Sequence, residues 1–316
     1  MTKRKIILIG SGAVGNSFLY SAMNRGIASE YGIIDLNVKG VEGNVLDFED
    51  GIAALEHPFN VYKATYKDCK DADIVVITAG RPQLPGETRL NMVEGNAKIM
   101  KNIALEVKKS GFKGITVIAS NPVDILTLVY QQVTSFDTKK VIGSGTSLDS
   151  SRLTRELSKR VGIAPQSIQA YVMGEHGDSS VSAFSVATIG GQPLKYFEEQ
   201  GKLDKSEYPA IHEFVWKKAY EIIDRKGATF YGIGVNLANI CNNIFNDSKK
   251  VIALGAYLEG QYENEGVYTG VPAVIGINGI EQIIELKLSR SEQNQFNKSV
   301  NRLKEVYQTA KEAIKE

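Results

Sequence analysis

His176 is the residue with the clearest chemical potential, because it is one of three histidines and has glycines on both sides, in Gly174-Glu-His-Gly-Asp178. An imidazole has an unperturbed pKa of about 6.5, so it can donate or accept a proton near neutral pH. The glycines permit unusual backbone conformations and the close approach of a ligand. The segment predicts a proton-transfer site; the alternative is a hydrogen-bonded loop histidine without a chemical role.

A glycine-rich turn near the N-terminus predicts a second ligand. A buried strand at 6–9 runs into Gly10-Ser-Gly12-Ala13-Val14-Gly15, and a helix at 16–23 and a strand at 31–34 ending at Asp35 follow. This order is typical of a dinucleotide-binding Rossmann unit, in which pyrophosphate lies at the N-terminus of the helix. Asp35 would accept hydrogen bonds from the adenosine ribose hydroxyls and repel a 2′-phosphate, so NAD is expected rather than NADP. The alternative is a glycine turn without a ligand.

The alternation of strands and helices continues beyond this unit, with strands at 73–78 and 114–119 and a helix at 91–109 between them. Ligands of such sheets bind at the carboxyl ends of the strands, so Gly80, Ser120 and Asn121 are expected in the same crevice as Gly12. The fold class predicted is α/β, a doubly wound parallel sheet of the Rossmann type followed by an α+β substrate or catalytic domain. The chain is about twice as long as a usual domain. We therefore predict two domains, a dinucleotide-binding domain at residues 1–145 and a substrate or catalytic domain at 146–316.

The second half predicts a mixture of strands and amphipathic helices. Strands are expected at 168–173, 181–186, 251–254 and 271–277, with helices from 207 to 245 that break near Gly227. The final helix, 292–315, has apolar residues at helical spacing and is interpreted as ordinary amphipathic packing.

Composition restricts the partners and the compartment. Lys and Arg total 37 and Asp and Glu 36, so no basic field for nucleic acid or an anionic membrane is expected. Cys69 and Cys241 are too few for a disulfide framework. The N-terminal basic and apolar residues imitate a secretory signal, but glycines interrupt the apolar run after four residues. A cytoplasmic protein that binds small molecules, or copies of itself, is predicted.

Two other sequence patterns resemble catalytic motifs but lack a residue or turn that the motif needs. His212-Glu213 begins a zinc-protease pattern, but the position of the second ligand is Trp216, so no metal site is expected. Ser179 and Ser180 lie close to His176 but lack the strand-to-helix elbow of a hydrolase nucleophile.

With these features in place, the sequence resembles the L-lactate and malate dehydrogenase family over almost the whole chain. Several ordered motifs carry the resemblance: Thr78-Ala79-Gly80, Gln83-Leu-Pro-Gly-Glu-Thr-Arg89, Asn121-Pro-Val-Asp124, Gly143-Ser144-Gly-Thr-Ser-Leu-Asp149-Ser-Ser-Arg152, Gly174-Glu-His-Gly-Asp178 and Lys226-Gly-Ala-Thr229.

The resemblance implies a role for each residue of a catalytic set. Protonated His176 would give a proton to the carbonyl oxygen of a 2-oxo acid while NADH gives hydride to the carbon. Asp149 would fix the tautomer of His176 and favour the imidazolium. Arg152 would bind the substrate carboxylate with its planar guanidinium. Arg89 would polarise the carbonyl from a mobile loop, and Asn121 would hydrogen-bond the substrate oxygen.

The same resemblance bears on the substrate. A malate enzyme of this family carries Arg where this chain has Gln83, because oxaloacetate has a second carboxylate that needs a cation. Neutral Gln83 and a small pocket beside Thr229 favour pyruvate and L-lactate, in a fermentative metabolism that regenerates NAD. Arg81, where relatives commonly have a small residue, is the departure that keeps malate open. Another L-2-hydroxy-acid dehydrogenase, or an NAD-binding protein without catalysis, remains an alternative.

The family also implies contacts with the cofactor, an assembly and an effector. Relatives activated by fructose 1,6-bisphosphate bind it through an Arg and a His whose positions here are Thr154 and Gln169, and Arg155 points about 100° away on a helix. Activity without this effector is therefore expected. A homotetramer is implied. The expected cofactor-binding residues are Gly10, Gly12, Ala13, Val14, Gly15, Asp35, Tyr66, Thr78, Ala79, Gly80, Ala119, Ser120, Asn121 and Ser144.

Overall fold

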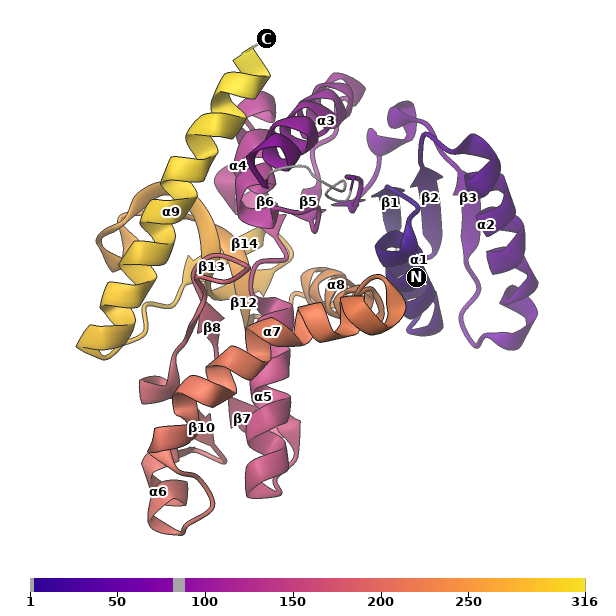
Figure 1. Cartoon of the computed structure of the whole chain (residues 1–316). Helices are drawn as coiled ribbons and strands as arrows, with labels where there is room; N and C mark the ends of the chain where they lie inside the picture. The colour runs from indigo at the N-terminus through magenta and orange to yellow at the C-terminus, as the bar shows by residue number, and fades with distance from the viewer. Residues whose placement is uncertain (1–2, 82–88, 316) are drawn as a thin grey trace.

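A computed structural model describes residues 3–81 and 89–315. Its centre is a nine-stranded sheet in the order β14-β13-β12-β6-β5-β4-β1-β2-β3 (Figure 1). The six strands from β3 to β6 are parallel, and the other three are antiparallel. The strands of this sheet are β1 (Lys5–Ile9), β2 (Glu30–Ile34), β3 (Asn60–Lys63), β4 (Ile74–Ile77), β5 (Ile115–Ile118), β6 (Val141–Gly143), β12 (Lys250–Glu259), β13 (Glu265–Gly276) and β14 (Gly279–Ile283).

The parallel half forms because its strands are short, continuous apolar runs. Every residue of β1, β4 and β5 is buried, as expected for strands covered by helices on both faces. β6 then pairs with β12 through Gly143 and Gly255. The predicted parallel sheet is thereby confirmed, and it continues into the second half of the chain.

Helices cover the sheet. α8, from the second half, packs against α1, and α3 packs against α4 and the long C-terminal α9. The α-helices are α1 (Ala13–Asn24), α2 (Val38–Asp50), α3 (Arg89–Ser110), α4 (Val123–Thr134), α5 (Ser147–Val161), α6 (Leu194–Glu199), α7 (Tyr208–Lys226), α8 (Tyr231–Phe245) and α9 (Arg290–Lys315). Short 3-10 helices are η1 (Ile52–Ala54), η2 (Tyr66–Cys69), η3 (Thr138–Lys140), η4 (Pro165–Ser167), η5 (Phe184–Val186), η6 (Lys205–Glu207) and η7 (Gln261–Glu263).

A second, smaller lobe has its own apolar core, and α5 and α7 extend through it (Figure 1). Leu153 and Leu157 of α5 and Ile211 and Val215 of α7 are buried there. Its small sheets consist of β7 (Ile168–Gln169), β10 (Thr188–Ile189) and β11 (Gln192–Pro193), and of β8 (Val172–Met173) and β9 (Val181–Ser182).

Several element boundaries differ from the sequence-based expectation. The strand expected at 168–173 is divided, because β7 pairs with β10 whereas β8 pairs with β9 in another sheet. The strand expected at 181–186 ends at 182 and continues as η5. The break near Gly227 is confirmed: this residue ends α7 with a left-handed φ of 82°, the conformation in which glycine carries no Cβ penalty.

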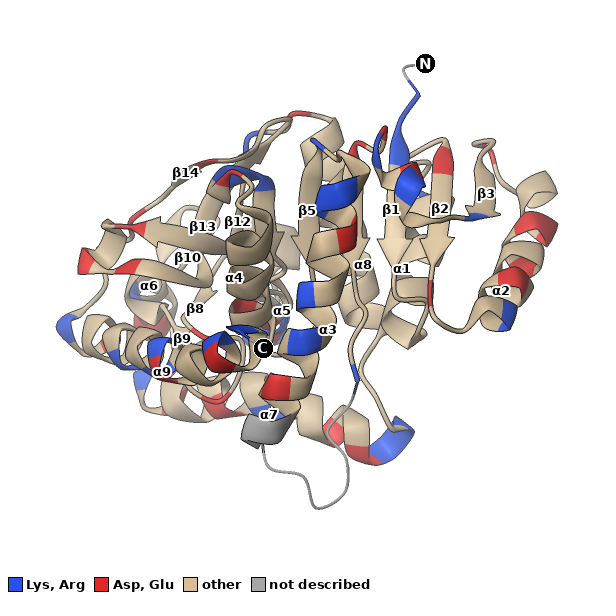
Figure 2. Cartoon of the chain, turned by 90° about the horizontal axis from the view of Figure 1, so that it is seen from above, with Lys and Arg blue, Asp and Glu red and all other residues tan. Residues whose placement is uncertain are grey.

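Basic and acidic residues are interspersed over the helices, as Figure 2 shows. Among the residues that the structure describes, no helix has the combination of length and apolarity that crossing a bilayer requires.

Candidate functional site

The glycine-rich turn lies between β1 and α1. Gly10 has φ +105°, and a Cβ there would lie 2.4 Å from the backbone N of Ala79. Thr78 donates its hydroxyl to the Gly10 carbonyl at 2.6 Å. The turn after β1 is therefore fitted to the segment after β4, and only glycine satisfies both the conformation and the contact.

The turn presents a free helix end to a ligand. Gly12 is the N-cap residue of α1, no side chain caps this end, and a Cβ at Gly12 would meet nothing within 4 Å. Exposed first-turn N–H groups and the helix dipole favour an anion such as pyrophosphate. Asp35, at the end of β2, accepts the Ser11 N–H at 2.7 Å and the Asn37 N–H at 2.8 Å. The arrangement fits a dinucleotide.

Three charged side chains meet behind the glycine turn. Asp149 lies in the first turn of α5, and Arg152 follows one helical turn later. Arg152 Nη1 donates to Asp149 Oδ1 at 3.1 Å, and the other oxygen of Asp149 pairs with His176 Nδ1 at 2.6 Å. Asp149 and Arg152 are buried, whereas the His176 side chain is 27% exposed. His176 is thus the most accessible side chain of this cluster.

The electrostatics of the cluster favour a protonated imidazole. The negative charge of Asp149 is the main reason that the pKa of His176 lies above its usual value, while burial and Arg152 act in the opposite direction. Burial alone would raise the pKa of Asp149, but His176 and Arg152 outweigh it and hold this pKa below its ordinary value. The cluster therefore stabilises a proton on His176 and a charge on Asp149.

Some of the predicted substrate and cofactor residues line a small cavity, although Arg152 is not among the described residues of its lining. Its volume is about 60 Å³, and His176 lies at its wall with Asn121 at the carboxyl end of β5 and Thr229 just before α8. The described residues of its lining are Val14, Ala119, Asn121, Ser144, Gly145, Leu148, His176, Thr229 and Ile233. Val14 belongs to the glycine turn, so the dinucleotide end of the crevice and the proton donor share one space.

The remaining predicted cofactor residues lie along the same sheet edge. Ser120 donates its hydroxyl to the Ala79 carbonyl at 2.6 Å, which joins the ends of β4 and β5. Gly80 is exposed beside Ser120. Tyr66 is half-buried in η2, where it packs against the core of the parallel half.

The expected substrate loop is only partly described. Gln83 lies outside the described residues, and Arg89 is the first residue of α3, with its side chain also outside them. At the start of the loop the Arg81 N–H donates to the Asn96 side chain at 3.0 Å. Asn96 also donates to the Asn121 carbonyl at 2.9 Å, so α3 is tied to the substrate side of β5.

The sequence interpretation missed the residues that hold the histidine loop. Gly174 exchanges two 2.9 Å backbone hydrogen bonds with Gly270 of β13. Ser299 of α9 accepts the Glu175 N–H at 2.8 Å, and a Cβ at Gly174, where φ is +88°, would lie 2.6 Å from the Ser299 hydroxyl. α9 is therefore more than amphipathic packing, because it contacts the loop that carries His176. Ser299 is not distinguished by sequence from other serines, so this role could not be predicted.

Two further acids lie around the loop. Glu175 is buried, accepts the Ser179 hydroxyl at 2.5 Å and lies 3.7 Å from Arg302 of α9. Asp124, at the start of α4, accepts the His176 N–H at 2.9 Å. Because Ser179 is engaged in this network, its hydroxyl serves the loop structure and not a hydrolase site.

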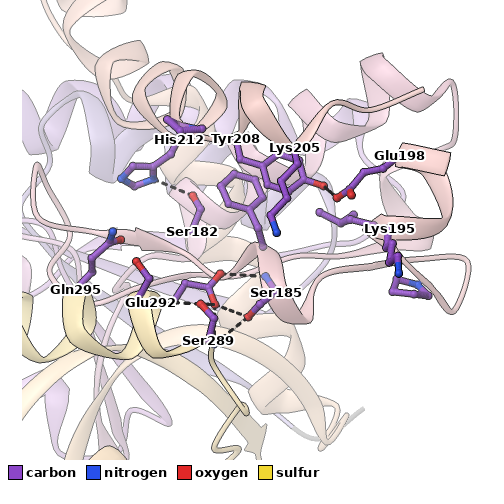
Figure 3. Close-up of a pocket in the computed structure, with 15 residues that line it drawn as sticks. Ser182, Ser185, Lys195, Glu198, Lys205, Tyr208, His212, Ser289, Glu292 and Gln295 are labelled. Carbon is purple, nitrogen blue, oxygen red and sulfur yellow. Dashed lines mark hydrogen bonds between the residues drawn. The ribbon is translucent and has the colours of Figure 1, made fainter. Parts of the chain in front are cut away.

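A roomier cavity, of about 540 Å³, lies in the second lobe, where α7, α9 and η5 meet (Figure 3). His212 lies there, and its Nδ1 hydrogen-bonds the Ser182 hydroxyl at 2.9 Å. Burial lowers the pKa of His212. We place the candidate site in the smaller cavity, because that cavity contains the histidine paired with a buried carboxylate and lies against the glycine turn.

Comparisons with known proteins agree with this architecture. Residues 4–143 match the family model described as the lactate/malate dehydrogenase NAD-binding domain. Residues 146–314 match the model of the lactate/malate dehydrogenase alpha/beta C-terminal domain. The chain is 53% identical to the L-lactate dehydrogenase of Mesoplasma florum over 99% of both chains. It is 55% identical to that of Mycoplasma capricolum over 98% of both.

Solved structures give the same result. The ligand-bound crystal structure of a minor L-lactate dehydrogenase from Enterococcus mundtii superposes with a TM-score of 0.96 at 42% identity, covering 98% of this chain and 99% of that one. Its ligand-free crystal structure gives a TM-score of 0.91 at 41% identity, covering 98% of each chain.

The charge cluster predicts a measurable proton affinity. In an NMR titration, His176 should titrate above pH 6.5, and Asp149→Asn should lower its pKa by about one pH unit or more, because burial remains while the attractive charge is lost. His176→Asn identifies the resonance. An unchanged pKa in Asp149→Asn would show that the carboxylate does not control the imidazole.

Proposed function

Because the chain belongs to the lactate/malate dehydrogenase family, we propose that it is an NAD-dependent L-lactate dehydrogenase that interconverts pyruvate and L-lactate. The single observation that carries this proposal is His176, paired with buried Asp149 and facing a small cavity at the glycine turn. The curated relatives, at 53–55% identity, are named L-lactate dehydrogenases. The reaction regenerates NAD in a fermentative metabolism.

The residues of this chain have separate tasks in the proposed reaction. NADH, when bound, supplies hydride to the carbonyl carbon. His176 gives its proton to the carbonyl oxygen, so a C–H bond and an O–H bond form and the imidazole becomes neutral. In the reverse direction neutral His176 removes the hydroxyl proton. Asp149 keeps the Nδ1 proton in place, which leaves Nε2 for exchange with the substrate.

Substrate recognition needs a partner for one carboxylate. One nitrogen of Arg152 is engaged by Asp149, and the other donors of the guanidinium plane can bind the substrate carboxylate bidentately. We assign polarisation of the carbonyl to Arg89 and hydrogen bonding of the substrate oxygen to Asn121. Thr229 lies at the wall of the cavity that contains His176, and we assign to it the packing against the substrate methyl group that the family resemblance implies.

The choice between pyruvate and oxaloacetate depends on a second cation. Gln83 is neutral and supports pyruvate, since a second buried carboxylate without a partner is costly. Arg81 is the residue that favours malate as the second candidate. Its guanidinium lies against α3, where a Cβ at Gly95 would come within 2.6 Å of Nη2. This contact with α3 supports pyruvate.

Initial rates of NADH oxidation with pyruvate and with oxaloacetate at equal concentrations test the proposal. We expect pyruvate to be preferred at least tenfold. The second carboxylate of oxaloacetate would be desolvated without a cation as its partner, and about this loss of rate follows from one such unpaired charge. His176→Asn is the matched control, because its amide fills similar space without carrying the proton. Preference for oxaloacetate would contradict the substrate assignment. Activity that survives in His176→Asn would contradict the proton-transfer assignment.

The same assay tests regulation. Gln169 and Arg155 are exposed and Thr154 is half-buried, and none of the three reproduces the Arg and His pair that binds fructose 1,6-bisphosphate in activated relatives. We expect no change in the KM for pyruvate when this effector is added. A large decrease in that KM would contradict this part of the proposal.

We further propose that the enzyme is a cytoplasmic homotetramer. Both cysteines are free and buried, which supports a reducing compartment. α1 and α8 pack together and leave Tyr20, Tyr231 and Val235 exposed by 67%, 69% and 53%. Exposed apolar side chains on two helices that pack together favour burial against a second copy.

Sedimentation velocity tests the assembly. The wild type should have the mass of four chains, and Val235→Asp should reduce it, because a carboxylate would be desolvated at the contact between copies. Ile277→Asp is the matched control, since Ile277 is equally exposed at 51% but lies between β13 and β14. A wild-type monomer, or an unchanged mass for Val235→Asp, would contradict the proposed interface.

A further inference from the structure

The main chain of His176 has its own partner, which the mechanism above does not use. Asp124 Oδ2 accepts the His176 N–H at 2.9 Å. Asp124 is only 3% exposed and lies in the first turn of α4, in a segment far from the histidine loop in sequence. The contact therefore fixes the loop at the residue that carries the imidazole.

The other oxygen of this carboxyl group is an anomaly. Oδ1 of Asp124 is buried and has no hydrogen-bond partner among the described residues. Burial raises the pKa of Asp124 to about 7, against the effect of the His176 N–H and the His176 charge. An unpaired buried carboxyl oxygen costs free energy that an apolar side chain would avoid. Packing alone therefore does not account for an acid at position 124.

The surroundings of His176 show what this acid can contribute. Asp149 and Arg152 face it from α5, Asp124 faces it from α4, and Glu175 precedes it in the loop. The negative charges of Asp149 and Asp124 raise the pKa of His176, and burial and Arg152 lower it. Asp124 thus acts on the imidazole by two routes, through the backbone hydrogen bond and through charge.

We propose that Asp124 is a positioning residue for the proposed dehydrogenase reaction, which holds the His176 main chain so that the imidazole meets Asp149 and which adds negative charge that retains the proton. The inference rests on the proposed function for its kinetic consequences. The carboxyl accepts the N–H in either protonation state, whereas its charge acts only when it is ionised, above about pH 7. Positioning should therefore persist across the pH range, and the charge effect should grow toward high pH.

Two substitutions separate these routes. Asp124→Asn keeps an oxygen that can accept the His176 N–H but removes the charge. Asp124→Leu has the same number and branching of side-chain heavy atoms, although its methyl groups are larger, and it can do neither. We measure kcat and the KM for pyruvate from pH 5.5 to 9, the Kd for NADH by fluorescence, and the His176 pKa by NMR.

The expected results differ in kind. At pH 6, Asp124→Asn should retain kcat to within about threefold. The pH at which pyruvate reduction is lost, as His176 gives up its proton, should be lower in this variant than in the wild type, and the His176 pKa should be lower by the same amount. Asp124→Leu should lose roughly tenfold to a hundredfold in kcat at every pH, because a small displacement of the proton donor is costly. Its Kd for NADH should stay within about threefold of the wild type.

Several outcomes would overturn the inference. If Asp124→Asn changes neither the pH dependence of kcat nor the His176 pKa, the Asp124 charge does not act on the imidazole. If Asp124→Leu retains full kcat, the hydrogen bond from the His176 N–H to Asp124 does not position the imidazole. If Asp124→Leu does not fold, as judged by circular dichroism, Asp124→Ala, which also lacks an acceptor for the His176 N–H, tests the positioning route in its place. Asp137→Asn is the matched control, because this exposed acid accepts a backbone N–H beyond the far end of α4; it should behave as the wild type. The NMR titration needs no turnover, so a wild type inactive with pyruvate would contradict the proposed function and leave this test intact.

Discussion

The shared carboxylate of Asp149 is the interaction on which the site depends. Its two oxygens bind different cations, with Arg152 on one side and His176 on the other. Burial of a carboxylate is expensive unless it is paired and hydrogen-bonded, and here both oxygens are satisfied. One charge therefore orients the imidazole, favours its protonation and holds the guanidinium that is proposed to bind the substrate.

The fold brings this carboxylate to the ligand edge of the sheet. α5 begins just after β6, so Asp149 lies near the carboxyl ends of the parallel strands, where the glycine turn and Asn121 also lie. The histidine arrives on a separate loop. That loop is held by Gly270 of β13, Ser299 of α9 and Asp124 of α4. The precision of the site is thus supplied by elements from both halves of the chain.

The sequence predicts the parallel sheet and the dinucleotide turn well, because both depend on local signals. Buried apolar runs define β1, β4 and β5, and glycine spacing followed by Asp35 defines the turn. The Asp149, Arg152 and His176 cluster was predicted through a resemblance, and its distances required the structure. Asp124 ends the Asn121-Pro-Val-Asp124 motif, but the motif gave no role for its side chain, and Ser299 lies in no motif. Both roles are tertiary hydrogen bonds, which the sequence does not indicate. Helix α2 was also not predicted, because Gly40 and Gly43 have low helix propensity and weaken its helical pattern.

A double-mutant cycle on kcat/KM for pyruvate, with Asp149→Asn, His176→Asn and the pair, tests the central claim most directly. If Asp149 acts chiefly through His176, the loss in the double variant should be well below the product of the two single losses. The carboxylate then has no imidazole left to orient or charge, and only its contact with Arg152 remains to be lost. Losses that multiply in the double variant would show that Asp149 and His176 act independently, and would contradict this account of the site.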